Sequence, residues 1–282
     1  MNHNSVSFPA ADFWQKALYS FFAVILFTNA VLSEDKMLPP EFARIFSQKK
    51  LVVAMLAVDQ PPYFMKDSHG KLIGLDVELA TEIANVLGVE LELKRTASTF
   101  DEVVQQVARK EADIAVSDLS RTRKRGLNVL FSRPYLRLKQ ALLLNRLKSK
   151  NEESTDWLNS SNKKIGVLEG SSYVDFAKMA FPEASVQTYN LWDSAAFAVI
   201  NGRIDAALMD DNEVITWTKL HPEALLYAQV RVLPDKEDNI SVITHWQDHH
   251  LHEWINLHID LLESEGRLEQ LKKKYFVHKK NK

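Results

Sequence analysis

The chain has 282 residues, of which 46% are hydrophobic and 26% are charged, and its net charge is −2. That length allows a sizeable core and two lobes, and the composition is that of an ordinary soluble globular protein. The near-neutral charge gives no support to non-specific nucleic-acid binding, so we expect no nucleic-acid partner. The absence of cysteine excludes disulfides, iron–sulfur clusters, cysteine-bound zinc and a thiol nucleophile.

The N-terminal segment predicts export. Residues 17–31 are mostly apolar, yet the run is shorter than the ~20 residues that a membrane span needs. This pattern is typical of a signal peptide, with cleavage after Ala30 or Ser33, and an uncleaved membrane anchor is the alternative. We therefore expect a periplasmic protein with a signal peptide or anchor over residues 1–33 and a lead-in segment over residues 34–47.

The first half of the remaining chain alternates short apolar runs with amphipathic stretches, which predicts an α/β fold. Residues 51–57 are typical of a buried parallel strand, and the Pro-rich loop 59–64 follows, at the end where open α/β sheets bind ligands. Apolar residues at helical spacing then predict a helix with Asp76 as its N-cap. Further predicted elements of this half are a strand at 91–93, a helix over 100–110, and strands at 114–116 and 140–145.

The stretch 112–135 is the most informative part of the chain. After a short predicted strand come, in order, Ser117, Ser120, Thr122 and Arg125. Hydroxyl and backbone N–H groups can donate to a small carboxylate, and a planar guanidinium can bind it through two parallel hydrogen bonds. On chemistry alone, the commoner explanation of four cations in five residues is a solvated basic turn.

The second half shows the same alternation of elements. Ser172 lies at a predicted helix start, where its hydroxyl can cap the helix or bind an anion. Asp210 and Asp211 can cap the next helix as a pair. The predicted elements are a strand, glycine turn and helix start over 164–173, a strand at 186–189, a helix over 193–201, a strand ending at Asp210, a return strand at 240–244 and one or two amphipathic helices over 251–276.

These motifs resemble those of the family 3 periplasmic solute-binding proteins, the polar amino acid receptors of ABC transporters. The family pattern is an Asp-Ala strand, then Ser-x-x-(Ser/Thr)-x-Thr-x-x-Arg, then Phe-Ser-x-Pro-Tyr. The chain matches it at Asp113, Ser117, Ser120, Thr122, Arg125, Phe131, Ser132, Pro134 and Tyr135. Segments near residues 71–80, 164–173 and 203–211 also match, so the resemblance covers residues 48–276.

The resemblance implies the type II periplasmic-binding-protein fold, in which two lobes, each a mostly parallel sheet flanked by helices, hold the ligand between them. Lobe 1 would comprise residues 48–145 and 240–276, and lobe 2 residues 146–239. A basic tail would remain at 277–282.

The resemblance also assigns roles to individual residues. The carboxylate of an α-amino acid would meet Arg125, Ser120 and Ser172, and its ammonium would meet Asp210 and Ser117. The pocket for the ligand's side chain would contain Gln60, Tyr63, Asp118 and Phe100, although many members have Tyr where this chain has Gln60. We expect a monomer without metal or cofactor that presents the amino acid to an inner-membrane ABC permease.

Two alternatives stay open. Cyclohexadienyl dehydratases, which act on arogenate-type substrates, resemble this family and share an end-of-strand Asp with a Glu three residues on, as at Asp210 and Glu213. They have a Pro-Gly-Gly-Thr-Asn turn, however, where this chain has Glu-Gly-Ser-Ser-Tyr at 169–173. A ligand-sensing relative without a transport role is the other alternative. The five histidines within 245–258 form no His-Glu-x-x-His motif, and we interpret them as a polar helix face.

Overall fold

The computed structural model describes residue 1 and residues 38–276, and the described residues from Pro40 onward belong to one compact unit. The predicted signal peptide or anchor, the cleavage positions after Ala30 and Ser33, and the basic tail at 277–282 lie outside the described residues. Among the helices that are described, none is long and apolar enough to cross a membrane.

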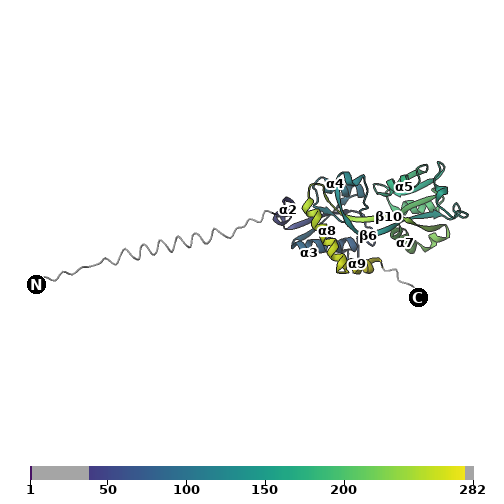
Figure 1. The fold of residues 1–282 in the computed structure, drawn as a ribbon. Helices are drawn as coiled ribbons and strands as arrows, with labels where there is room; N and C mark the ends of the chain where they lie inside the picture. The colour runs from purple at the N-terminus through teal and green to yellow at the C-terminus, as the bar shows by residue number, and fades with distance from the viewer. Residues whose placement is uncertain (2–37, 277–282) are drawn as a thin grey trace. The chain divides into compact units, whose positions relative to one another are not determined.

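One eight-stranded sheet runs through the fold, with strand order β4-β1-β5-β10-β6-β9-β7-β8. Its strands are β1 (Lys50–Leu56), β4 (Glu90–Ala97), β5 (Ile114–Ala115), β6 (Val129–Asn145), β7 (Lys164–Leu168), β8 (Ser185–Tyr189), β9 (Ala206–Asp210) and β10 (Ala228–His245). β1 pairs in parallel with β4 and β5, and β7 pairs in parallel with β8 and β9. The long antiparallel strands β6 and β10 join these two parallel groups (Figure 1).

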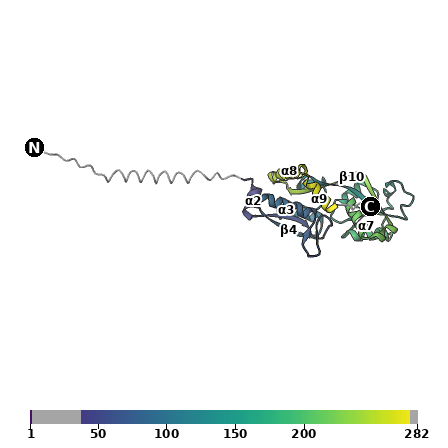
Figure 2. The same ribbon diagram turned by 90° about the horizontal axis from the view of Figure 1, so that it is seen from below.

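Helices flank both parallel groups, which completes the predicted two-lobed α/β arrangement (Figure 1). The first group carries α2 (Pro40–Gln48), α3 (Leu75–Leu87), α4 (Phe100–Ala108), α8 (His249–Ser264) and α9 (Arg267–Phe276), and the second carries α5 (Tyr173–Ala180), α6 (Trp192–Ile200) and α7 (Asp211–Leu220). Figure 2 shows α8 and α9 lying beside α3. Because one sheet runs through both lobes, the residue limits of the lobes stay a prediction.

Smaller elements complete the described chain. A short antiparallel ribbon, which the sequence did not predict, follows the Pro-rich loop and pairs β2 (Met65–Lys66) with β3 (Leu72–Ile73). Three single turns of 3₁₀ helix are η1 (Arg125–Leu127), η2 (Asp156–Leu158) and η3 (Pro222–Leu226).

Burial explains why apolar runs identified the parallel strands. The predicted strand at 51–57 corresponds to β1, whose residues from Val53 to Leu56 are all buried, because helices cover both faces of a parallel sheet. The predicted helical region 251–276 corresponds to α8 and α9, which separate at Gly266. Gly266 has φ +71, a left-handed conformation that glycine adopts without steric cost.

The prediction that Asp76 is the N-cap of α3 is wrong. The helix begins at Leu75, after Gly74, so Asp76 lies inside the first turn. Asp76 is fully buried there, and its carboxylate accepts hydrogen bonds from the Tyr135 hydroxyl at 2.8 Å and from the Asp118 N–H at 2.6 Å. Gly74 has φ +138, and a Cβ at this position would lie 2.1 Å from the Tyr63 carbonyl oxygen, so only glycine fits.

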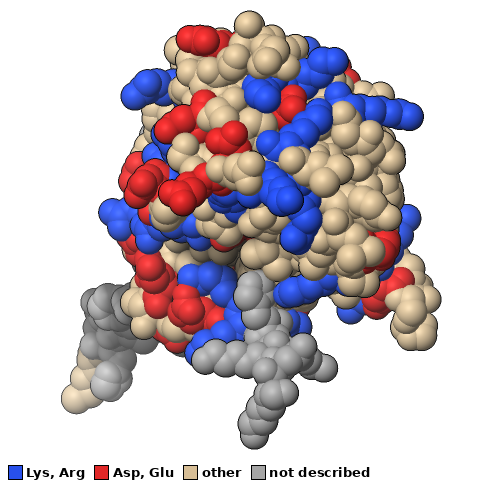
Figure 3. Space-filling view, turned by 90° about the vertical axis from the view of Figure 1, so that its right-hand side faces the viewer, with Lys and Arg blue, Asp and Glu red and all other residues tan. Residues whose placement is uncertain are grey.

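The surface of the second strand group carries charges of both signs. On the face drawn in Figure 3, Lys and Arg side chains lie among Asp and Glu side chains, in keeping with the net charge of −2. A mixed surface of this kind favours solubility.

Candidate functional site

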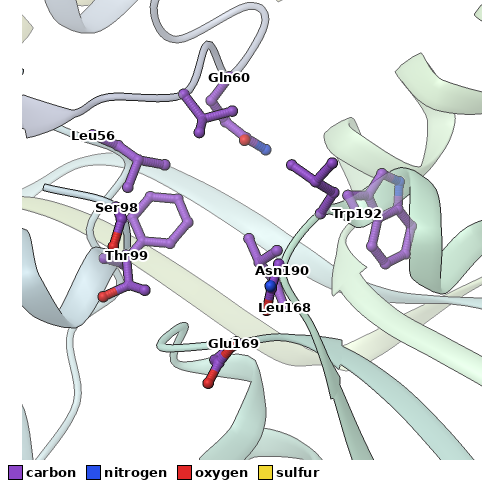
Figure 4. A pocket seen from close by; sticks show the side chains of 11 residues that line it. Leu56, Gln60, Ser98, Thr99, Leu168, Glu169, Asn190 and Trp192 are labelled. Atoms are coloured by element: carbon purple, nitrogen blue, oxygen red, sulfur yellow. The ribbon is translucent and has the colours of Figure 1, made fainter.

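A cavity of about 370 Å³ lies between the two lobes at the carboxyl ends of β1, β4, β7 and β8. We call it the cleft cavity, and it is lined by Leu56, Val58, Gln60, Ser98, Thr99, Phe100, Leu168, Glu169, Asn190, Leu191 and Trp192. In Figure 4, Gln60 and Leu56 lie on the opposite side of the cavity from Leu168 and Trp192. Its position is the one at which open α/β sheets bind ligands.

A second, much smaller cavity of about 10 Å³ adjoins the first at Phe100. We call it the charged pocket, and it is lined by Phe100, Asp118, Ser120, Arg125, Ser171, Ser172, Tyr173 and Met209. A volume of roughly 10–15 Å³ holds a single water molecule. The charged pocket, as this structure shows it, therefore has no room for an amino acid.

Arg125 is buried beside the charged pocket, and its guanidinium donates hydrogen bonds to other residues of the chain. Its Nε and Nη2 both donate to Asp101 Oδ1 at 3.0 Å. Two longer bonds, of 3.4 Å, reach the carbonyl oxygens of Ser120 and Gly170. Arg125 is only 5% exposed, whereas the Asp101 side chain is 45% exposed. The partner of the buried cation is thus a carboxylate that water can solvate.

A hydrogen-bonded chain connects the two lobes next to Arg125. The Ser172 hydroxyl donates to the Ser120 hydroxyl at 2.8 Å, and the Ser120 hydroxyl donates to Asp238 Oδ2 at 2.9 Å. The Tyr173 hydroxyl donates to the same oxygen at 2.8 Å. Ser172 makes no side-chain capping bond to α5, so the structure does not use its hydroxyl as a helix cap.

Asp210 lies at the end of β9 and is buried. Its Oδ1 accepts the backbone N–H of Glu213 at 2.7 Å and the Tyr63 hydroxyl at 3.2 Å, so Asp210 rather than Asp211 caps α7. Burial raises the pKa of Asp210 to about 7, and the nearby Asp238 carboxylate adds to the rise. Asp210 therefore caps α7 and also places a carboxyl group between the lobes.

The other predicted site residues divide between the cavities and the core. Gln60 and Phe100 line the cleft cavity, and Asp118 lines the charged pocket. Tyr63 lines neither cavity, because its ring packs edge-on against Phe276 with centroids 5.5 Å apart. Ser117 is fully buried, and its hydroxyl accepts the backbone N–H of Leu56 at 3.0 Å. The roles given to these residues stay predictions.

Buried carboxyl groups are the feature that the sequence did not reveal. Asp118 is surrounded by Asp76, Asp210, Glu213 and Asp238. Burial raises the pKa of Asp118 well above its usual value, and the Asp210, Asp76 and Asp238 carboxylates raise it further. Burial also raises the pKa of Asp76 to about 7, and it raises those of Glu213 and Asp238. The region between the lobes therefore contains a cluster of carboxyl groups that hold their protons more tightly than usual.

Two parallel strand groups joined by two long strands, with polar side chains of both lobes meeting between them, define a two-lobed ligand-binding protein. A sequence model of the bacterial extracellular solute-binding proteins, family 3, matches residues 51–278, and the chain belongs to this family. The predicted family and fold class are thereby confirmed.

Relatives within this family have different names. The chain is 25% identical over 225 residues to the arginine-binding periplasmic protein of Mannheimia haemolytica, covering 79% of this chain and 90% of that one. It is 27% identical over 238 residues to the membrane-bound lytic murein transglycosylase F of Pseudomonas fluorescens (strain Pf0-1), covering 80% of this chain. The match covers only 46% of that transglycosylase, so this chain spans about half of its length.

The fold also matches solved structures. The ancestral amino acid-binding protein AncCDT-1, a precursor of cyclohexadienyl dehydratase, is similar with a TM-score of 0.72 and 27% sequence identity. The match covers 84% of this chain and 99% of that chain. The relatives of this chain thus include proteins named as binding proteins and proteins named as enzymes. The function therefore has to be argued from the residues of the site.

Proposed function

We propose that this protein is a receptor that captures an α-amino acid between its lobes and presents it to an ABC-type permease. The observation that supports the proposal is that Ser120, Arg125 and Ser172 line one pocket, with Asp210 near Asp118 of the same pocket. Hydroxyls and a guanidinium suit a carboxylate, and an aspartate suits an ammonium. A zwitterion held in this way bridges the lobes and favours their closed state.

The contacts that Arg125 and Asp210 make within the chain indicate which of them a ligand would replace. The ligand carboxylate would replace Asp101 at Arg125, and because Asp101 is 45% exposed, its carboxylate returns to water at little cost. The ligand ammonium would take the place of the Tyr63 hydroxyl at Asp210. Arg125 and Asp210 each exchange one hydrogen-bond partner for another in this way, so neither is left without a partner.

The cleft cavity would hold the side chain of the amino acid. Its volume of about 370 Å³ falls within the range of roughly 300–1,000 Å³ that is common for small-molecule sites. Leu56, Leu168 and Trp192 contribute apolar walls, and Gln60 and Glu169 contribute polar groups. This mixture fits an extended side chain with an apolar stem and a polar end.

A calorimetric screen of the purified exported chain against the common amino acids tests the proposal. At least one amino acid should bind with one-to-one stoichiometry, and its amide, which lacks the carboxylate, should bind far more weakly. If the amide binds as well as the free acid, Arg125 has no carboxylate partner and the proposal fails.

Location and partners form the second part of the proposal. Members of this family are extracellular solute-binding proteins, and the Mannheimia relative is named as periplasmic. We place this protein in the periplasm as a monomer whose closed form is recognised by an inner-membrane permease. Closure would bring surfaces of both lobes together, and a permease could recognise that combined surface.

Glu213 supports an enzyme as a second candidate. Its carboxyl group is buried beside the Gln60 side chain, and burial raises the pKa of this carboxyl group well above the usual value. A protonated carboxylic acid of this kind can act as a general acid in the loss of water. The turn at 169–173, which lacks the Pro-Gly-Gly-Thr-Asn sequence of the dehydratases, makes this candidate the weaker one.

A further inference from the structure

The hydroxyl of Tyr63 is bound to Asp210, the residue to which the proposed function assigns the ligand ammonium. Tyr63 precedes the ribbon of β2 and β3 in the first lobe, and Asp210 ends β9 in the second. Their hydrogen bond of 3.2 Å therefore joins the lobes. Tyr63 is fully buried, and Asp210 is 1% exposed. An oxygen that the ligand would use is thus bound by a side chain of the protein.

The backbone of Tyr63 is held by the residues around it. Its carbonyl oxygen accepts the backbone N–H of Asp76 at 3.0 Å, and its N–H donates to the carbonyl oxygen of Gln60 at 2.9 Å. Gly74 passes so close to Tyr63 that a Cβ on this glycine would lie 2.1 Å from the same carbonyl oxygen. Because the backbone is fixed in this way, the side-chain torsions of Tyr63 decide where its hydroxyl lies.

Phe276, the last residue of α9, packs against the Tyr63 ring. The two ring centroids are 5.5 Å apart and the ring planes make an angle of 61°, which is a favourable edge-on arrangement for an aromatic pair. The neighbours of Phe276, Lys274 and Tyr275, both donate hydrogen bonds to Glu78 of α3. Because these bonds attach the end of α9 to α3, Phe276 is held where it restricts the Tyr63 ring.

Loss of the bond to Asp210 has a cost for the Tyr63 hydroxyl. Asn212 also contacts this hydroxyl, but its Nδ2 donates to the hydroxyl oxygen at 3.5 Å and therefore cannot accept the hydroxyl proton. A buried donor that loses its acceptor costs more free energy than an ordinary hydrogen bond contributes. A ligand ammonium that binds Asp210 therefore has to compensate for the loss of the Tyr63 bond.

We propose that the Tyr63 hydroxyl competes with the ligand ammonium for Asp210, and that Phe276 is the positioning residue that holds the hydroxyl there. The proposal rests on the proposed function, which places the ammonium at Asp210. In this role Tyr63 does not contact the side chain of the ligand. It lowers the affinity for every α-amino acid by a similar factor, because each of them brings the same ammonium to the same carboxylate.

Tyr63→Phe removes the hydroxyl and keeps the ring, so it is the test variant. Calorimetric titration with the two amino acids that bind most tightly in the screen should show both binding about three- to tenfold more tightly than to the parent. Thermal unfolding without amino acid should show lower stability, because a buried hydrogen bond is lost. A merely structural role of Tyr63 would instead lower the stability and weaken binding together. The matched control, Tyr227→Phe, removes an exposed hydroxyl at the end of η3 and should change neither quantity.

Phe276→Leu tests the positioning role. This substitution removes the ring that restricts Tyr63 but keeps an apolar side chain, so binding should tighten about two- to threefold relative to the parent. In the Tyr63→Phe background the same substitution should have no effect, because no hydroxyl is left to position. Phe276→Tyr, which keeps a ring, should bind like the parent. Equal effects of Phe276→Leu in both backgrounds would overturn the positioning role.

The same titrations separate this proposal from the function on which it rests. If Tyr63→Phe binds amino acids no more tightly than the parent while Asp210→Asn binds them more weakly, the receptor stands and the competition is wrong. If Asp210→Asn leaves the affinity unchanged, the ammonium does not bind at Asp210, and the competition fails together with that part of the proposed function. If no amino acid binds to the parent, both proposals fail.

Discussion

Replacing Arg125 by Ala should abolish most amino acid binding while leaving the fold nearly unchanged. A charge-assisted hydrogen bond contributes roughly 1.5–3 kcal/mol. Loss of one partner of a buried charge pair costs about 2–5 kcal/mol, because the other charge is left stranded. At 1.4 kcal/mol per decade, Arg125→Ala should weaken binding by roughly 30- to several-thousand-fold.

The structure predicts that the stability of the ligand-free protein changes much less. Within the chain Arg125 pairs with Asp101, whose side chain is 45% exposed, so the substitution leaves that carboxylate in contact with water rather than stranded in the interior. The free energy of unfolding and the binding constant should therefore respond differently to one substitution. Calorimetric titration with the best amino acid of the screen, together with thermal unfolding, measures both quantities.

The basic run beside Arg125 provides matched controls. Arg123 and Lys124 are exposed neighbours in the chain, and the Lys124 side chain is 70% exposed. Arg123→Ala and Lys124→Ala should bind amino acids almost as the parent does. If Arg125→Ala also binds like the parent, the guanidinium belongs to a solvated turn and the site lies elsewhere.

Asp210 requires a more conservative change, because it also caps α7. Asp210→Ala would lose a cap worth about 1 kcal/mol as well as the ammonium partner, so a fall in binding would have two explanations. Asp210→Asn keeps a capping oxygen and removes the charge. Binding should weaken over the same range as in Arg125→Ala, and an unchanged affinity would remove Asp210 from the site.

Three further predictions concern processing, catalysis and pH. Intact mass of the exported protein should show cleavage near Ala30 or Ser33, and a membrane-associated chain that still begins at Met1 would favour the anchor. Prephenate and arogenate should not be converted, whereas turnover that disappears in Glu213→Gln would favour the dehydratase. Because burial raises the pKa of Asp76 and Asp210 to about 7, the folded state binds protons that the unfolded state releases above ~4. Thermal unfolding of the ligand-free protein should therefore show stability falling as the pH rises from about 4 to 7, and no such fall would refute these pKa values.

The local elements of this structure could be predicted from the sequence. Apolar runs marked β1 and β7 because buried parallel strands need no polar face. The family resemblance pointed to Ser120, Arg125 and Ser172, which line one pocket between the lobes, and to Asp210, which lies near Asp118 of that pocket.

The partners of these residues could not be predicted, because they depend on distant strand pairing. Asp238 lies in the polar run 234–239, which is typical of a surface loop. The pairing of β10 with β6, which places Asp238 opposite Leu138, carries it into the buried region. Asp76 was interpreted as a cap because it precedes an apolar helix, but tertiary contacts with Tyr135 and Asp118 set its role. Local sequence contains no signal for either contact.

Closure of the lobes on the ligand is the central claim, and small-angle scattering of the mature protein tests it most directly. Because the charged pocket measures only about 10 Å³ in this structure, the proposed function requires the lobes to separate before an amino acid can enter. Saturation with the best amino acid should therefore reduce the radius of gyration, and Asp210→Asn should blunt that reduction at equal ligand concentration. A radius that stays the same in the parent at saturating ligand would contradict the account.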